Sequence, residues 1–372
     1  MSNEKKIKVA FVLGALNRGG TESLILDVCR RAESTLFEVV CVYRKEGNLS
    51  DEFHMTNAKL IRLPKSSHML SYISALRKLL INEKVDIAHS QTPSNTMVLG
   101  LALIGTSIKL VTSFHGHSFA HSNWFKCNFV YKISKKIICV SENQKQFYQT
   151  HWHLGHDNKL EVVHNGIDTN KFDNIKYPKP DFLENQTPKS INLVVVGSFC
   201  SGRSQDFLLL VINHIQETLR EKCIKIYFIG GPFVGEEYIY KQCEEYIQEH
   251  HLTDIAIMLG VRNDVLTILH YVDGFLYSTR TDTFGIAVVE AMMSGLPVIT
   301  NDYVVMKEVT HDGALATLYK SNDIDDCSQK ILTFLEYIDE YKTKACKIKE
   351  HVKNLYSIDN HIKKLMNIYQ KL

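Results

Sequence analysis

The sequence predicts an α/β protein made of two doubly wound parallel sheets. Its 372 residues exceed what one ordinary domain needs and fit two. Short apolar runs alternate along the chain with segments of helical length. One segment interrupts this alternation with three prolines and many polar residues, which predicts a linker. We therefore expect a first domain over residues 1–171, the linker over 172–189, a second domain over 190–345, and a helical segment over 346–372 that packs back across the domains.

The first domain begins with the apolar run IKVAFVL, which predicts a strand, and continues with a helix near residues 21–33. The following runs are apolar on both faces, as expected for parallel strands buried in βαβ units. These further strands are predicted over residues 38–43, 85–90, 108–114, 136–141 and 160–165.

The second domain repeats the same alternation after the linker. Strands are expected over 191–198, 224–231, 255–260, 273–278 and 296–300, with helices near 205–221, 235–250 and 286–294. Doubly wound sheets bind ligands at the carboxyl ends of their strands. We therefore expect the carboxyl ends of the two sheets to face a shared cleft.

Composition and charge exclude several classes of protein. Hydrophobic residues make up 45% and charged residues 23%, which is ordinary globular composition. The net charge is +2, the sum of +7 over residues 1–185 and −5 over the remainder, so a nucleic-acid partner is not expected. None of the nine cysteines forms a C-x-x-C pair, and no leader or membrane-spanning run is apparent. The sequence predicts a cytoplasmic protein.

The strongest local signal lies in residues 279–302, TRTDTFGIAVVEAMMSGLPVITND. A strand ends before it, a loop carries Asp282 to Gly285, and a helix follows with Glu290 in its second turn. Glycine permits close approach of a ligand, and the free amides of a helix start favour phosphate. The two carboxylates would accept hydrogen bonds from sugar hydroxyls. The alternative is a surface aspartate and a helix-capping glutamate.

Each predicted domain has a glycine-containing turn directly after its first strand. GALNRGGTES at 14–23 suits a loop that contacts phosphate, although it lacks the G-x-G-x-x-G spacing and the Lys-Ser/Thr of a P-loop. VVVGSFCSGRSQD at 194–206 places Gly197 and Arg203 between a strand and a helix, where a guanidinium can bind a diphosphate. A turn without ligand and a solvated arginine are the alternatives.

Among 17 histidines, His115 stands out because it follows a strand and precedes a glycine. His117 and His121 come soon after it, but no cysteine or carboxylate stands at ligand spacing, so no metal is expected. The G-x-S-x-G elbow and the H-E-x-x-H motif are absent, which excludes the corresponding hydrolases and metalloproteases.

Residues 122–136, SNWFKCNFVYKISKK, interleave aromatic residues with lysines. Such a segment suits an interfacial helix that meets anionic lipid. The interpretation we favour is a domain helix with a buried aromatic face and solvated lysines. The segment therefore offers peripheral membrane contact as a second interpretation.

Taken together, these motifs resemble the retaining family 4 glycosyltransferases of the GT-B fold, in order along nearly the whole chain. GGTES resembles the family's Gly-Gly-x-Glu turn, FHGHS its strand-end histidine, and VVHNGIDTNKF its Asn-Gly-x-Asp segment. MLGVRNDV and DTFGIAVVEAMMSGLPVI resemble the most specific signatures. The resemblance implies two Rossmann-like domains that face a shared cleft.

Two positions depart from the family's pattern. Asp282 stands where the family usually has glutamate, one methylene longer. Ser198 stands where the family's phosphate loop has arginine, while Arg203 takes the position of its later lysine. The diphosphate would thus meet one cation where the family generally supplies two.

The resemblance implies a role for each matching residue. Glu290 would hold the ribose, Asp282 the donor sugar, and Arg203 the leaving diphosphate. His115 would lie by the sugar. The backbone amides at 284–286 would lie near the sugar or phosphate, and the glycines at 19 and 20 by the phosphates. The implied catalytic residues are His115, Asp282 and Glu290, and the implied donor-binding residues are Gly19, Gly20, Gly197, Arg203, Phe284, Gly285, Ile286 and Glu290.

The expected activity is transfer of a sugar, with retention, from a nucleotide sugar to a glycan or lipid-linked acceptor in bacterial surface-polysaccharide synthesis. A UDP-sugar is favoured over a GDP-sugar, and no metal or other cofactor is expected. The alternatives are a GT-B nucleotide-sugar epimerase and a non-catalytic nucleotide-sugar-binding partner. A dinucleotide oxidoreductase ranks lower because its glycine fingerprint is missing.

Overall fold

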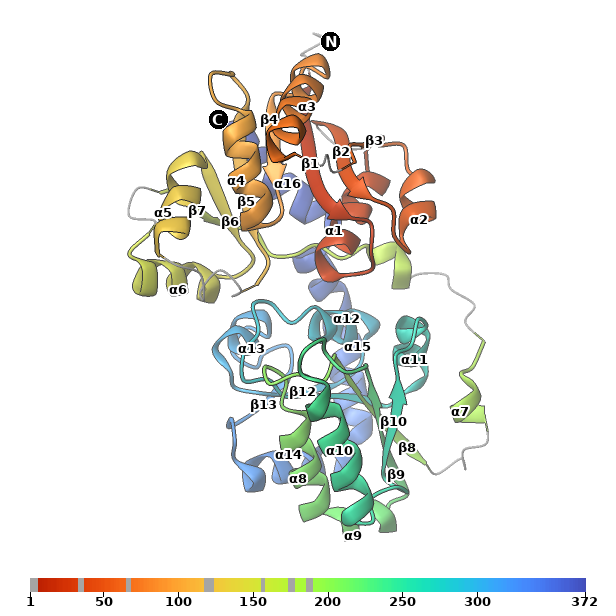
Figure 1. Ribbon diagram of the computed structural model, residues 1–372. Coiled ribbons are helices and arrows are strands. Elements are labelled where there is room, and N and C mark those ends of the chain that lie inside the picture. Colours follow the sequence, from red (N-terminus) through yellow and green to blue (C-terminus); the bar gives the residue numbers. More distant parts are fainter. Residues whose placement is uncertain are drawn as a thin grey trace. The chain divides into compact units, whose positions relative to one another are not determined.

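The computed structural model describes residues 6–32, 37–64, 68–116, 124–154, 158–172, 178–184 and 190–372. The chain divides into two units, each built on a parallel sheet (Figure 1). Unit 1 comprises residues 1–168 and 356–372, and unit 2 comprises residues 169–355. The predicted class, two doubly wound Rossmann-like domains, is confirmed.

Unit 1 contains a seven-stranded sheet in the order β3-β2-β1-β4-β5-β6-β7, with every neighbouring pair parallel. The order reverses between β1 and β4, the place where doubly wound sheets open a ligand crevice. The short strand β3 has no strong apolar run, and the sequence analysis missed it. The strands are β1 (Ile7–Ala15), β2 (Phe37–Lys45), β3 (Lys59–Arg62), β4 (Ile87–Ser90), β5 (Lys109–Phe114), β6 (Lys136–Cys139) and β7 (Leu160–Val162).

Helices cover both faces of the unit 1 sheet (Figure 1). Buried side chains of α1, α2 and α16 form the core on one face, and those of α3 and α4 form the core on the other. A smaller cluster lies under α5 and α6. The helices are α1 (Gly20–Arg30), α2 (Ser50–His54), α3 (Met69–Asn82), α4 (Pro93–Ala102), α5 (Trp124–Ile133), α6 (Glu142–Trp152) and α16 (Ile358–Tyr369).

The C-terminal helix α16 completes the core of unit 1, although almost 190 residues separate it from the end of the unit's first segment. Ile167 pairs with Ser357 in a parallel bridge, in which Ile358 N donates to Ile167 O over 2.9 Å. A Cβ on Gly166 would come within 2.7 Å of Ile358 Cα, so only glycine allows this approach. The Asn-Gly-x-Asp segment recognised in the sequence therefore holds the returning chain.

Unit 2 contains a six-stranded sheet in the order β10-β9-β8-β11-β12-β13, again parallel throughout. Its order reverses between β8 and β11, so the loops after these two strands flank the expected ligand crevice. The strands are β8 (Ile191–Val196), β9 (Ile224–Ile229), β10 (Ala256–Gly260), β11 (Gly274–Tyr277), β12 (Val298–Asn301) and β13 (Thr317–Tyr319).

On one face of this sheet, α8, α10 and α14 supply buried side chains to the core, while α12 packs against β11 and β12. The helix expected over 205–221 is divided at Ile215 into α8 and α9. The helices are α7 (Asp181–Glu184), α8 (Gln205–His214), α9 (Gln216–Glu221), α10 (Glu237–Glu249), α11 (Val265–Tyr271), α12 (Ile286–Ser294), α13 (Val304–Val309), α14 (Ile324–Glu336) and α15 (Ile338–Tyr356).

The segment expected as a linker is described in part. Residues 173–177 and 185–189 lie outside the described residues, and α7 occupies the portion between them. The structural division falls after Asp168 and before Tyr356, where the sequence placed boundaries at 171 and 346. Within the described ranges, no helix carries an apolar run long enough to cross a bilayer.

Candidate functional site

The loop after β8 is held tightly against β9. Gly197 N donates to Ile229 O and Phe199 N to Gly231 O, each over 2.9 Å. A Cβ on Gly230 would lie 2.1 Å from Gly197 O, so the close approach of these two turns requires glycine at position 230. The buried Gln205 donates from Nε2 to the carbonyls of Gly197 and Ser198. The loop is therefore a rigid support for the side chains it carries.

Arg203 extends from this loop toward the loop after β11. Its backbone pairs with Thr279, and its guanidinium forms an ion pair with the carboxylate of Asp282. The guanidinium also lies 5.2 Å from the ring centroid of Tyr277. The aromatic face attracts a cation electrostatically, so ring and carboxylate together orient the arginine.

Asp282 has polar partners on both of its oxygens. Oδ2 accepts from Arg203 and from the Tyr277 hydroxyl, the latter over 2.7 Å. Oδ1 accepts from the backbone amides of Thr283 over 2.7 Å and Phe284 over 3.3 Å. The side chain is only 9% exposed. The carboxylate assigned to the donor sugar thus faces Arg203 and Tyr277 here, and it balances the charge of the arginine.

Gly285 begins α12 in a left-handed conformation, with φ of 80°. This conformation favours glycine, and a Cβ there would also force Met306, whose Cε would lie 2.6 Å away, to move. Phe284 is buried, and Ile286 and Glu290 share one face of α12 because they are four residues apart. Glu290 is half-buried in the second turn of the helix. The start of α12 therefore lies beside the Arg203–Asp282 pair.

The glycine turn of unit 1 follows β1 at the same edge of the sheet where β4 and β5 end. Gly19 is the residue before α1, and its carbonyl accepts from Ser23 N over 2.9 Å. Oε2 of Glu22 lies 2.8 Å from where a Cβ on Gly19 would be, so this carboxylate covers the turn. Burial raises the pKa of the Glu22 carboxyl above its usual value.

His115 lies at the carboxyl end of β5, where its Nε2 is 2.8 Å from Oε1 of Gln91. Burial, together with the neighbouring His361, lowers the pKa of His115 to about 4. His115 is partly buried, whereas His89 and His361 are buried, and burial depresses their pKa values as well. At neutral pH His115 is therefore an uncharged hydrogen-bonding group.

These buried histidines predict that acid destabilises unit 1. The pKa values of His115 and His361 are about 4 in the folded chain, below the value near 6.5 of an unfolded histidine. The unfolded state then binds more protons between these values. Stability is complete above about pH 6.5 and falls toward pH 4, on the order of 3 kcal/mol for each histidine.

The measurement is the urea midpoint of the unit 1 transition at pH 7.5 and pH 5. His361→Gln should flatten the pH dependence, whereas His54→Gln, at an exposed histidine of α2, should leave it unchanged. An equal loss between the two pH values in wild type and His361→Gln would contradict the prediction.

The structure brings Gly197, Arg203, Asp282, Phe284 and Gly285 together at the ends of β8 and β11 in unit 2. It places Gly19, Gly20 and His115 at the carboxyl edge of the unit 1 sheet. Sequence reasoning missed Tyr277 and Gln205, because neither carries a motif and only the fold brings them to Asp282 and Gly197. His117 and His121 lie outside the described residues. Among the residues that the structure describes, no group of three metal-binding side chains is found.

Comparison with known proteins identifies the family of the chain. Residues 18–171 match the family model Glycosyltransferase Family 4, and residues 181–366 match Glycosyl transferases group 1. The UDP-Gal:α-D-GlcNAc-diphosphoundecaprenol α-1,3-galactosyltransferase of Escherichia coli is 25% identical over an alignment of 395 residues including gaps. The alignment covers 99% of this chain and 98% of the relative. The O-antigen biosynthesis glycosyltransferase WclY of Escherichia coli is 21% identical over 324 residues, 82% of each chain.

Solved structures show the same fold. HepE of Anabaena, crystallised with UDP and glucose, superposes with a TM-score of 0.83 at 15% identity, covering 98% of this chain and all of that one. A glycosyltransferase from Rickettsia africae superposes with a TM-score of 0.82 at 19% identity, covering 99% of each chain. The chain therefore belongs to the glycosyl transferases group 1 family and is a family 4 glycosyltransferase of the GT-B fold.

Proposed function

We propose that the protein is a retaining, metal-independent glycosyltransferase that uses a nucleotide sugar, with UDP favoured over GDP. Its acceptor is a glycan or lipid-linked saccharide in the synthesis of a bacterial surface polysaccharide. One observation carries the proposal. The loops after β8 and β11 bring Arg203 to the start of α12 at the point where the strand order of unit 2 reverses.

The chemistry follows from where charge develops. Breaking the bond between the anomeric carbon and the phosphate oxygen leaves negative charge on the nucleoside diphosphate. Arg203 and the first amides of α12 stabilise that charge without a metal ion. The acceptor hydroxyl oxygen forms the new bond to the anomeric carbon on the same face, and its proton passes to the departing phosphate. Glu290 binds the ribose hydroxyls of the donor.

The nature of the donor and acceptor rests on the relatives. The Escherichia coli galactosyltransferase is named for UDP-Gal and for a diphosphoundecaprenol-linked acceptor, and HepE was crystallised with UDP and glucose. WclY is named for O-antigen biosynthesis. These names support a UDP-sugar and a lipid-linked acceptor for this chain. The neutral His115 would hydrogen-bond the sugar without adding charge.

The test is release of UDP or GDP from a panel of nucleotide sugars, with lipid-linked and free glycan acceptors, with and without EDTA. We expect transfer from a UDP-sugar that EDTA leaves unchanged, with retained anomeric configuration by NMR. Glu290→Ala should abolish transfer, whereas Glu336→Ala, at an exposed glutamate of α14, should not. Full activity of Glu290→Ala would refute the site, and product formed without acceptor would indicate an epimerase.

Helix α5 supports a membrane partner for the same enzyme. The preferred interpretation, a buried aromatic face, is wrong for three residues: Trp124, Phe125 and Phe129 are 54%, 73% and 41% exposed. Cys127 and Val130 form the buried side of the helix instead. Lys126, Lys132 and Lys135 are exposed as well. We propose that this face of α5 binds anionic lipid at the inner face of the membrane, where a lipid-linked acceptor resides.

The structure refines the test of this contact. Lys136 pairs with Glu161 over 2.6 Å and is partly buried, so the changes belong at Lys126, Lys132 and Lys135. Replacing these three lysines with glutamate should abolish salt-sensitive binding to vesicles that contain phosphatidylglycerol. Phe125→Ser should weaken the binding without altering its salt dependence. Absence of binding by the wild-type protein would remove the proposal. Residues 122 and 123 lie outside the described residues.

A further inference from the structure

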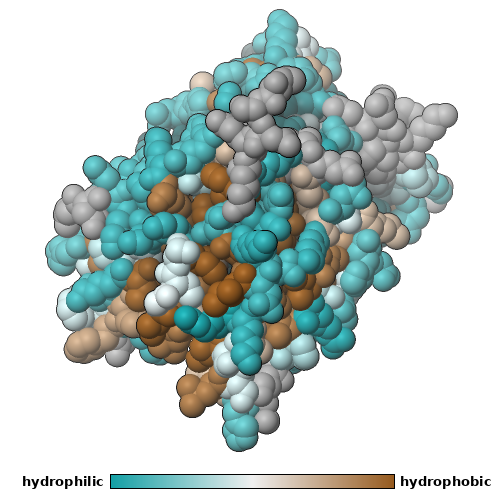
Figure 2. All heavy atoms as spheres, turned by 90° about the horizontal axis from the view of Figure 1, so that it is seen from above, coloured by the Kyte–Doolittle hydropathy of each residue, from teal (hydrophilic) through white to brown (hydrophobic). Residues whose placement is uncertain are grey.

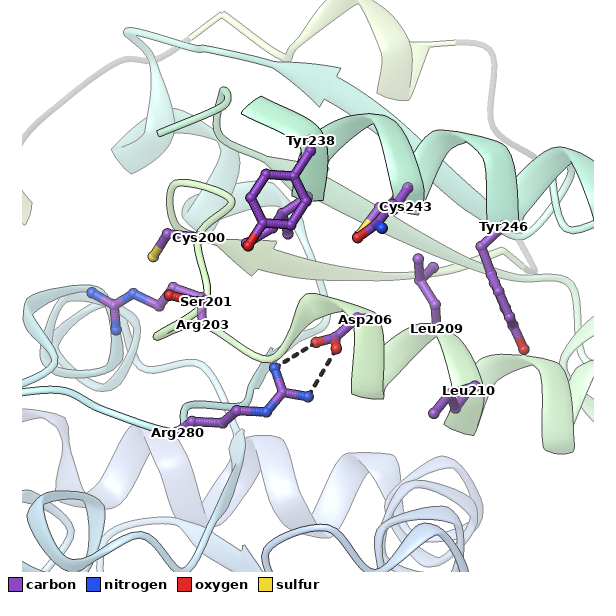
Figure 3. A pocket seen from close by; sticks show the side chains of 12 residues that line it. Cys200, Ser201, Arg203, Asp206, Leu209, Leu210, Tyr238, Cys243, Tyr246 and Arg280 are labelled. Carbon is purple, nitrogen blue, oxygen red and sulfur yellow. Dashed lines mark hydrogen bonds and ion pairs between the residues drawn. The ribbon is translucent and has the colours of Figure 1, made fainter. Parts of the chain in front are cut away.

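A hollow of about 530 Å³ opens between α8 and α10 on unit 2, and no role has been assigned to it above (Figure 3). This volume lies within the range of sites that bind small molecules. Its floor is apolar, with Leu209 and Cys243 almost fully buried. The space-filling view from above shows hydrophobic residues lying among hydrophilic ones at the surface (Figure 2). The hollow differs from such patches because it is concave and combines aromatic with charged groups.

Two tyrosines of α10 line the hollow from one side. Tyr238 and Tyr246 are eight residues apart, which separates them by about 12 Å along the helix axis. Gln242 lies between them and faces the same space. Tyr246 is half-buried against the core and its ring packs against His250 at 4.1 Å, so it is a fixed platform. Tyr238 is 56% exposed at the open end.

The opposite wall carries an ordered pair of charged side chains. Arg280 donates from Nη1 and Nη2 to the two oxygens of Asp206 over 2.9 and 2.8 Å, and Figure 3 shows this pair on the side of the hollow away from α10. Both groups are planar and exposed, and each retains hydrogen-bonding capacity toward solvent. Ser201 adds a hydroxyl at the end nearest the β8 loop.

We propose that this hollow, here called the α8–α10 groove, binds a saccharide chain at a site separate from the donor. A sugar ring presents C–H groups on its faces and hydroxyls around its edge. The faces pack on apolar and aromatic surfaces, whose negative ring faces attract C–H hydrogens, and the hydroxyls bond to planar polar groups. The groove offers two such platforms, with Gln242 between them and the Arg280–Asp206 pair opposite.

The separation of the tyrosines favours a chain over a single sugar. One ring cannot contact both platforms across about 12 Å, so binding should strengthen once a fragment reaches from Tyr238 to Tyr246. Arg203 lines one end of the groove, but Figure 3 shows its guanidinium directed away from the tyrosines, and it forms an ion pair with Asp282. The groove and the donor site thus share a loop without sharing their ligand groups. The relevance of a glycan rests on the proposed function.

The experiment measures binding of bacterial polysaccharide fragments, from monosaccharides to octasaccharides, to the full-length protein without nucleotide. We expect affinity to rise with fragment length. Tyr238→Ala and Tyr246→Ala should each weaken the binding of long fragments about tenfold. Tyr246→Phe, which keeps the platform and the core packing, should bind within about threefold of wild type. Tyr337→Ala, at an exposed tyrosine after α14, is the matched control.

Three results would overturn the proposal. They are no binding by any fragment, equal binding by wild type and the two alanine variants, and displacement of the fragments by UDP, which would assign the groove to the donor. Unchanged circular dichroism and thermal unfolding confirm that the variants are folded. Because fragments are tested without donor, the result is independent of transferase activity. Absence of sugar transfer with intact glycan binding would count against the proposed function alone.

Discussion

Arg203→Ala is expected to lower kcat for sugar transfer about 100- to 1,000-fold, the loss typical of removing one group that stabilises a developing anion. Ser198 provides no charge where a second cation would otherwise stand, so Arg203 is the cation that this loop can offer to the leaving diphosphate. The substitution also leaves Asp282 without its ion-pair partner. A negative carboxylate beside the diphosphate would add repulsion to the loss of attraction.

Two variants separate these effects. Arg203→Lys should restore part of the rate, because lysine also binds phosphate, though as a point charge. Arg203→Ala combined with Asp282→Asn should bind UDP more tightly than Arg203→Ala alone, because the carboxylate that repels the diphosphate is gone. The matched control is Arg220→Ala. Arg220 is an exposed arginine that, like Arg203, donates to an aspartate, in this case Asp254. A kcat for Arg203→Ala equal to that of the control would refute the assignment.

Removal of the last helix is expected to prevent unit 1 from folding. Deletion after Tyr356 takes away six buried side chains of the unit 1 core: Ile358, Ile362, Leu365, Met366, Ile368 and Tyr369. At about 1.5–3 kcal/mol for each, their burial contributes roughly 9–18 kcal/mol, comparable to the whole stability of a domain. The deletion also removes the Tyr369 hydroxyl, which lies 2.6 Å from Nδ1 of the buried His89.

Amide hydrogen exchange provides the measurement, because it reports each unit separately. In the truncated chain, amides of β1 and α1 should exchange within seconds, while those of β8 and β9 stay protected. A variant with Lys363→Ala and Asn367→Ala, at exposed positions of α16, should protect unit 1 as wild type does. Protected β1 amides in the truncated chain would show that the helix is dispensable.

The sequence predicted the elements whose signals are local. Apolar strands flanked by glycine turns indicated both sheets, and the spacing of Asp282, Gly285 and Glu290 indicated a site after β11. Tyr277 was missed because its hydroxyl reaches Asp282 only through the turn that the fold imposes. The short strands β3 and β13 were missed for a related reason, since their pairing to β2 and β12 supplies most of their stability.

Side-chain exposure was the least predictable property. The pattern of aromatic residues in α5 predicted that they form its buried face. The buried residues of this helix are instead Cys127 and Val130, whose smaller side chains pack against the domain. Likewise, nothing local in the sequence of α16 shows which domain it completes. Its apolar positions indicate an amphipathic helix, but its partners lie far earlier in the chain, in the bridge at Ile167, the close approach at Gly166 and the core of unit 1.

The return of the chain at α16 also sets an order of events during synthesis. The first 168 residues of unit 1 leave the ribosome before unit 2, yet their apolar core lacks α16 until Ile358–Tyr369 are made. At about 5–20 residues per second, that interval lasts roughly 10 to 40 s. Unit 2, which is continuous, can finish folding meanwhile. The domain made first is thus completed last, and its apolar face is open to chaperones throughout that time.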